Sequence, residues 1–102
     1  MNFMAASSKG PEVGSAVELL KALGNPIRLS IVVSLLKGPR CVHDLTDELA
    51  LPQPLVSQHL AVLRTSTLIS ARRVGRENSY SIADDHVERI ARAALDHAQE
   101  KK

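Results

Sequence analysis

Four residues near the end of the chain have the types and spacing of ligands for a first-row transition metal. Asp84 and His86 lie two positions apart, ten residues separate His86 from His97, and Glu100 follows three positions later. On a helix, eleven positions advance about 16 Å, so one ion with ligand bonds of about 2 Å cannot touch both histidines. His97 and Glu100, three positions apart, can share an ion, and so can Asp84 and His86 if Asp84 lies in the frayed first turn, so each end offers half a site. A second, antiparallel copy of the helix would complete two equivalent sites per dimer.

The same residues also fit an ordinary surface helix. An Asp at a helix N-terminus interacts favourably with the helix dipole, and His and Glu are common on a polar face. Whether these residues form a metal site or a solvated face therefore depends on the elements that position them.

Composition favours one small helical domain. The chain has 102 residues, of which 44% are hydrophobic and only 2% aromatic, so its core must be built from Leu, Ile, Val and Ala. The net charge of +2 becomes meaningful for nucleic acid only if the cations cluster. The single cysteine, Cys41, excludes an internal disulfide, and no apolar run is long enough to span a membrane. We expect a cytoplasmic protein with no membrane association.

Small and polar residues predict a flexible tail over residues 1–11. Apolar periodicity predicts one folded domain over residues 12–102. Helices are expected over residues 16–23, 27–36 and 42–50, and from Pro54 onward. The last two, separated by the break at 51–53, are typical of a helix-turn-helix whose second helix enters the DNA major groove. Gln58 could pair with an adenine, Ser57 could bond a base or a phosphate, and Gln53 could also reach DNA.

Beyond Thr67 the apolar period shortens to about two, which predicts a β-hairpin with strands at 68–74 and 79–82 and a turn at 75–78. Arg72, Arg73 and Arg76 lie near its tip. A hairpin after a helix-turn-helix is a wing, whose arginines would reach phosphates or an adjacent minor groove. The opposing interpretation is that these arginines only solvate an edge hairpin.

The last helix, from about Asp84, carries an apolar stripe that could pack on a partner helix or on the chain's own first helix, and a dimer formed through both terminal helices would satisfy both interpretations. The expected fold is mainly α with a β-hairpin: a winged helix-turn-helix of about five helices and a two-stranded wing. The members of the stripe are Val87, Ile90, Ala91, Ala94 and Leu95.

The chain resembles the ArsR/SmtB family of bacterial metal-responsive repressors over about residues 17–100. The resemblance implies a homodimer that represses transcription when metal-free and loses DNA affinity when metal binds. Asp84, His86, His97 and Glu100 match the family's zinc-sensing pattern across two terminal helices. The other matching segments are Leu23-Gly24-Asn25-Pro26-Ile27-Arg28, Cys41-Val42-His43-Asp44-Leu45, Val56-Ser57-Gln58-His59-Leu60 with Leu63-Arg64, and Val74-Gly75-Arg76 with Tyr80.

The family's second metal site is matched only in part. Cys41, His43 and Asp44 stand where thiol-rich members have Cys-Val-Cys, and residues 1–24 hold no His or Cys to complete the set. This second site is therefore expected to be vestigial. Cys41 is expected to be a small buried residue, and His59 a hydrogen-bonded core residue.

Two carboxylates and two imidazoles without a thiolate suit Zn(II), with Co(II) as a close mimic. Four protein ligands and no evident substrate pocket argue against a zinc enzyme, since catalytic zinc keeps an open position. The expected function is a DNA-binding repressor that Zn(II) releases from its operator. The alternative is a winged-helix repressor that responds to Co(II), Ni(II) or a non-metal effector.

Overall fold

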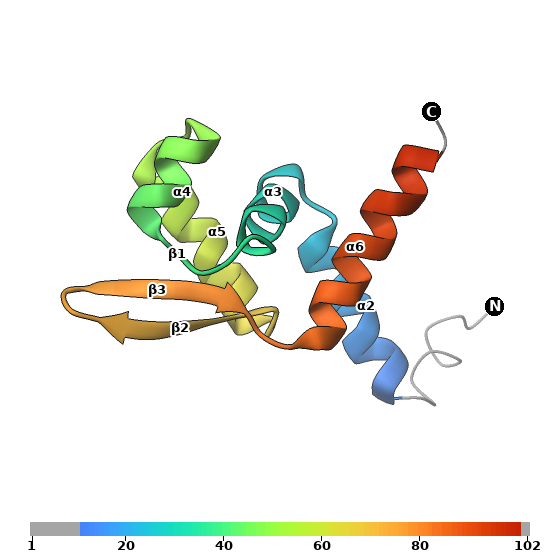
Figure 1. Ribbon diagram of the computed structural model, residues 1–102. Coiled ribbons are helices and arrows are strands. Elements are labelled where there is room, and N and C mark those ends of the chain that lie inside the picture. The colour runs from blue at the N-terminus through green and yellow to red at the C-terminus, as the bar shows by residue number, and fades with distance from the viewer. Residues whose placement is uncertain (1–10, 101–102) are drawn as a thin grey trace.

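The computed structural model describes residues 11–100, which form five helices and three short strands (Figure 1). Residues 1–10 of the expected tail lie outside the described range, and Pro11 is already the first helical residue. The elements in chain order are α2 (Pro11–Leu23), α3 (Pro26–Leu35), β1 (Arg40–Cys41), α4 (Val42–Leu49), α5 (Gln53–Thr65), β2 (Ile69–Val74), β3 (Glu77–Ile82) and α6 (Asp85–Glu100).

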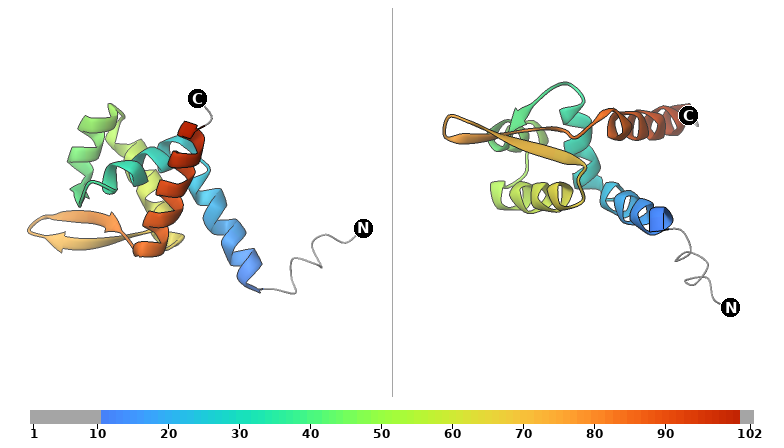
Figure 2. Two further views of the ribbon diagram at one scale, coloured as in Figure 1. Left: turned by 45° about the vertical axis from the view of Figure 1, so that its right-hand side comes forward. Right: turned by 90° about the horizontal axis from the view of Figure 1, so that it is seen from below.

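The elements separate into two groups. Helices α3, α4 and α5 pack together beside the sheet, while α2 and α6 lie on the side away from the hairpin tip (Figure 2). The expected winged helix-turn-helix of five helices is confirmed. None of the described helices is both long and apolar enough to cross a bilayer.

The core is built from aliphatic residues, as the composition predicts. Helix α5 buries Val56, Leu60 and Leu63, the expected i, i+4, i+7 stripe. Every other helix contributes at least one buried apolar residue. The full buried cluster is Ala22, Leu23, Ile31, Val32, Leu35, Leu45, Val56, Leu60, Leu63, Leu68, Ile69, Val87 and Ala91.

The turn between α2 and α3 forms as predicted. The Asn25 side chain accepts hydrogen bonds from the backbone N–H groups of Ile27 and Arg28, each at 3.0 Å. Pro26 occupies the first turn, where its missing N–H is not needed. The N-cap therefore fixes the direction in which α3 leaves the end of α2.

The sheet differs from the prediction in two ways. It has a third strand, β1, which pairs with β3 through Arg40 opposite Tyr80 and Cys41 opposite Ser79. The hairpin loop has two residues instead of four, because Val74 pairs with Glu77. Gly75, with φ +63°, occupies the first loop position, where a two-residue hairpin of type II′ requires a positive φ.

Helix α6 begins at Asp85, one residue later than expected, with Asp84 immediately before it. Val87 and Ala91 are buried, whereas Ala94 of the expected stripe is exposed. Within the described part of the chain, α6 packs mainly against α3 and β3. The chain's own first helix is therefore not the main intrachain support of α6, which corrects one of the two expectations, while packing on a partner helix stays a prediction.

Candidate functional site

The first half of the expected metal site forms at the start of α6. Asp84 accepts a hydrogen bond from the backbone N–H of Val87 at 3.1 Å, which stops the helix from fraying at this end. The same Asp84 oxygen lies 3.6 Å from Nδ1 of His86. Both side chains are exposed, so the carboxylate and the imidazole are brought together at the surface.

The second half lies at the other end of the helix. His97 and Glu100 are exposed and belong to the last turns of α6. In residues 11–100 of one chain, no three His, Cys, Asp or Glu side chains are close enough to hold an ion. The two pairs are thus separate half-sites.

Three of the four expected ligands share one face of α6, which turns away from the chain's own core, and Asp84 lies just before the helix. At about 100° per residue, His86, His97 and Glu100 fall within about 60° of one another. Their mean direction is about 120° from that of the two buried residues, Val87 and Ala91. Ala93 lies exposed on the same face between the half-sites. Ala93 was not among the expected site residues, although helical spacing alone indicates its position.

The residues of the expected vestigial site do not form a complete ligand set within residues 11–100. The backbone N–H of Cys41 donates to Oδ2 of Asp44 at 3.3 Å, which uses this carboxylate to cap α4, while His43 is exposed. A backbone hydrogen bond at Asp44 lowers the pKa of the Cys41 thiol, but burial and the hydrogen bonds to Asp44 and Glu77 outweigh it, so the pKa is raised overall. Metal binding must displace the thiol proton, so a raised pKa makes coordination by Cys41 less favourable.

Two expectations about the burial of side chains were wrong. Cys41 is only partly buried, because it lies in the short edge strand β1 rather than under a helix. His59 is also only partly buried and lies outside the core cluster, although it is hydrogen-bonded as expected: its Nδ1 is 3.2 Å from Nη1 of Arg28.

The helix-turn-helix presents the expected polar residues on α5. Gln53 and Gln58 are exposed, and Ser57 is partly exposed. Nε2 of Gln53 donates to Oγ of Ser57 at 2.7 Å, so the first turn of α5 carries a preformed polar pair. The turn before it is tight, since Ala50 ends α4 in the left-handed conformation with φ 56°.

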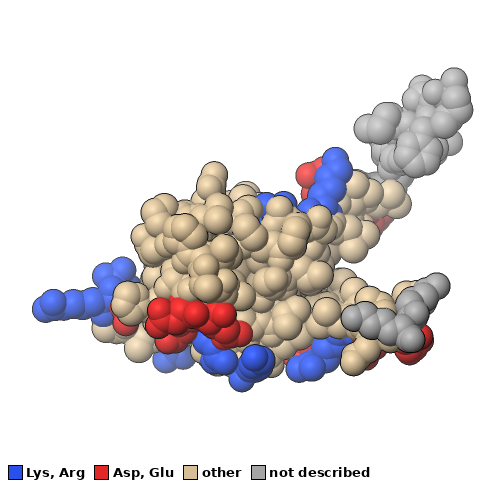
Figure 3. Space-filling model, turned by 90° about the horizontal axis from the view of Figure 1, so that it is seen from above, with Lys and Arg blue, Asp and Glu red and all other residues tan. Residues whose placement is uncertain are grey.

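The three hairpin arginines are all exposed, but they do not share one face. Arg72 pairs with Ser79 and Arg73 with Asn78 in the β2–β3 ladder, so their side chains alternate across the sheet. Nε of Arg73 donates to the carbonyl of Gly75 at 3.3 Å, and Arg76 occupies the loop itself. Figure 3 shows cationic side chains at the hairpin end of the molecule, with a compact acidic patch beside them.

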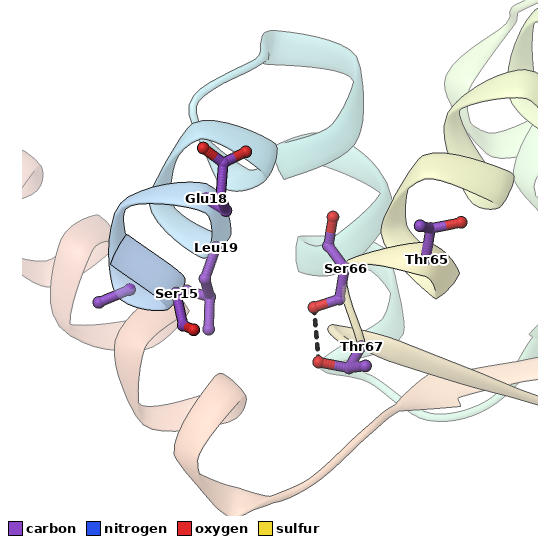
Figure 4. Close-up of a pocket in the computed structure, with 7 residues that line it drawn as sticks. Ser15, Glu18, Leu19, Thr65, Ser66 and Thr67 are labelled. Atoms are coloured by element: carbon purple, nitrogen blue, oxygen red, sulfur yellow. Dashed lines mark hydrogen bonds between the residues drawn. The ribbon is translucent and has the colours of Figure 1, made fainter. Parts of the chain in front are cut away.

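A hollow of about 480 Å³ lies between α2 and the end of α5 (Figure 4). Hydroxyl groups and small apolar groups line most of it, with Glu18 as the one carboxylate. Thr67 donates to the carbonyl of Ser66 at 2.6 Å, which directs this hydroxyl onto the backbone. The hollow offers neither an imidazole nor a thiol, so its lining does not make a metal site.

Comparison with known proteins gives a consistent result. Residues 25–71 match the family model described as bacterial regulatory protein, arsR family. The chain is 48% identical over 86 residues to the HTH-type transcriptional repressor SmtB of Mycobacterium tuberculosis, covering 84% of this chain and 64% of that protein. It is 39% identical over 80 residues to the HTH-type transcriptional regulator NmtR of the same organism, covering 78% of this chain and 67% of that protein.

The fold comparison agrees. The homodimeric winged helix-turn-helix DNA-binding domain Mb0332 from Mycobacterium bovis, described as a possible ArsR-family regulator, superposes with a TM-score of 0.85 at 29% identity. The superposition covers 91% of this chain and 86% of that domain. The chain thus spans somewhat less than two thirds of the SmtB relative but most of this winged-helix domain.

Proposed function

Because this chain belongs to the ArsR/SmtB family of bacterial regulatory proteins, we propose that it is a homodimeric transcriptional repressor that Zn(II) releases from operator DNA. The observation that carries the proposal is the pair of exposed half-sites on α6, which face away from the chain's own core. Both ligand pairs are exposed, so a second chain could reach them.

The proposed dimer is supported by apolar surface that one chain leaves uncovered. Val13, Val17 and Leu20 recur at i, i+4, i+7 on α2 and are 49%, 42% and 55% exposed. A stripe of this kind on a soluble domain marks a contact surface. With α2 and α6 together at the subunit interface, the two α5 helices would lie on opposite sides of the dimer axis and could enter successive major grooves.

In the proposed complex, α5 reads the major groove through Gln58, Ser57 and Gln53. Gln58 can bond an adenine at two positions, while the Gln53–Ser57 pair can serve bases or phosphates. The exposed arginines of the hairpin bind backbone phosphates, which strengthens binding to every sequence and makes it sensitive to salt.

The proposed metal ligands are Asp84 and His86 of one chain with the partner's His97 and Glu100. Zn(II) held by these four side chains would tie the two α6 helices together. In this chain Asp84 holds the helix start through one oxygen, and its second oxygen is available for coordination. The exposed Ala93 lets the two helices approach closely. The resulting dimer geometry would no longer match successive major grooves.

The alternative proposal is that an inducer other than Zn(II) releases the repressor from DNA. Two imidazoles and two carboxylates also accept Co(II), whereas Ni(II) prefers more ligands in octahedral or square geometry. A repressor that responds to Co(II), Ni(II) or a non-metal effector would keep the same DNA-binding surface.

The test is a DNA-binding titration on a duplex that the wild-type protein enriches from a random-sequence library, hereafter the selected duplex. We expect Zn(II) to weaken binding of the wild type and to leave His97→Ala bound. His43→Ala, which removes an exposed histidine outside α6, is the matched control and should respond like the wild type. Release of His97→Ala by Zn(II) would exclude the proposed site. Zinc that strengthened DNA binding would reverse the mechanism.

A further inference from the structure

Arg28 connects three helices through one guanidinium group. Its Nε donates to the backbone carbonyl of Ala22 in α2 at 2.7 Å, and its Nη1 lies 3.2 Å from Nδ1 of His59 in α5. Arg28 itself belongs to α3 and is partly buried. The proposed dimerisation helix and the proposed recognition helix are therefore joined by a single side chain.

The chemistry of the two groups sets the direction of both bonds. A guanidinium can only donate, so Nδ1 of His59 must be the acceptor. The tautomer of His59 that matches this contact carries its proton on Nε2. Ala22 lies in the last turn of α2, where carbonyl groups lack partners within the helix, and a cation is favoured there.

The Arg28 contacts are separate from the packing that holds the fold together. α3 and α5 already meet through fully buried residues, among them Val32, Val56 and Leu60. Close packing of these side chains restrains the two helices. Two charge-assisted hydrogen bonds from a planar group add a directional restraint to this packing.

We propose that Arg28 is a positioning residue for DNA recognition, which sets the orientation of α5 relative to the end of α2 by bridging His59 and the Ala22 carbonyl. The proposal rests on the proposed DNA-binding function. In a dimer, a rotation of α5 against α2 changes how both recognition helices meet two half-sites. Contacts to phosphates tolerate such a rotation, whereas bidentate base contacts do not.

If Arg28 orients α5, its loss should weaken specific DNA binding more than non-specific DNA binding. The measurement is the Kd for the selected duplex and for a scrambled duplex of the same composition, at a temperature where every variant is folded. We expect Arg28→Ala to weaken binding to the selected duplex about tenfold or more, the scale of one lost base contact, with little change on the scrambled duplex. A residue that only stabilised the fold would not change this ratio.

Matched variants test the two partners. His59→Gln keeps an acceptor oxygen and should retain the wild-type ratio, whereas His59→Leu should lower it as Arg28→Ala does. The double variant Arg28→Ala/His59→Leu should be no worse than Arg28→Ala alone, because the contact that His59→Leu removes is already absent in Arg28→Ala. Lys21→Ala removes an exposed charge from α2 and should leave the ratio unchanged.

Two results would overturn the proposal: an unchanged ratio in Arg28→Ala, which an equal loss on both duplexes would give, or strictly additive losses in the double variant. If Arg28→Ala does not fold, the ratios of His59→Leu and His59→Gln decide. If the wild type enriches no duplex from the library, the proposed DNA-binding function fails, and this outcome is distinct from the other two.

Discussion

At the scale of single residues, Asp84 can cap α6 with one carboxylate oxygen and bind a metal ion with the other. One oxygen accepts the hydrogen bond from the Val87 N–H at 3.1 Å and lies 3.6 Å from the His86 ring. The cap holds the carboxylate in place before any ion arrives, which lowers the entropy lost on coordination. Substitutions at Asp84 can therefore separate helix capping from metal binding.

The first prediction concerns Asp84→Asn and Asp84→Ala. Asn is as good an N-cap as Asp, so Asp84→Asn should keep the free energy of unfolding within a few tenths of a kcal/mol of wild type while weakening Zn(II) binding. Asp84→Ala should weaken Zn(II) binding equally and also lose about 1 kcal/mol of stability. Chemical denaturation and competition with a chelating dye measure the two quantities. Wild-type zinc affinity in Asp84→Asn would remove Asp84 from the ligand set.

At the scale of elements, Glu48 of α4 joins three segments. Ser34 of α3, which is 1% exposed, donates to Oε1 of Glu48 at 2.8 Å. Nζ of Lys37 and Nε of Arg40 lie 3.6 Å and 3.5 Å from the same carboxylate. The Ser34 hydrogen bond first, and then the two cations, lower the pKa of Glu48. This carboxylate thus helps to hold α4 against α3 and the strand β1.

The second prediction follows from that lowered pKa. A carboxyl group whose folded pKa is lowered stabilises the fold above its unfolded pKa of about 4.3, and this stabilisation is lost as the pH falls through the folded value. The wild type should lose more stability between about pH 5 and pH 3 than Glu48→Gln, measured by thermal unfolding at fixed protein concentration.

Glu18→Gln is the control for this pH dependence. Glu18 lies 3.8 Å from Lys21 in an exposed pair, which should contribute little to stability. Its acid profile should therefore follow the wild type. Parallel acid profiles for Glu48→Gln and wild type would contradict the role given to Glu48.

The elements also show how far a sequence pattern can predict this fold. The helices followed from local signals, such as the Val56, Leu60 and Leu63 spacing and the Asn25-Pro26 start of α3. The strand β1 did not, because two residues carry no periodicity and its pairing with β3 is made across 38 or more positions of the chain. Helical spacing also shows which side of α5 carries His59, but not that Arg28 reaches it from α3.

The candidate site, like the fold, could be predicted from the sequence only in part. Spacing alone indicated that Asp84 and His86 are separated from His97 and Glu100, since helix rise is nearly constant. The direction of this face relative to the buried stripe depends on how α6 packs against α3 and β3, which is a tertiary contact that no local pattern encodes. The cap from Asp84 to Val87 likewise became visible only in the structure.

At the scale of the whole molecule, the proposed zinc and DNA sites are coupled and must affect one another equally. If Zn(II) weakens DNA binding by some factor, the selected duplex must weaken Zn(II) binding by the same factor. The third prediction is that both factors agree and lie between about 5 and 150, the range of a coupling of 1–3 kcal/mol. Zinc titrations with and without saturating selected duplex measure the second factor.

In His97→Ala both factors should fall to near one. A wild-type protein whose zinc affinity did not change with DNA, while zinc still released DNA, would show that zinc acts through the DNA or through another site.

The uncovered stripe of Val13, Val17 and Leu20 has a consequence for the cell as well as for the fold. On the proposed function, a lone chain holds only half of each ligand set, so both metal response and operator occupancy depend on the supply of paired chains. The abundance of pairs rises with the square of the chain concentration when few are paired. Gene dosage would then set the metal threshold, and a strain with extra copies of the gene would respond at a different zinc level without any change in a ligand residue.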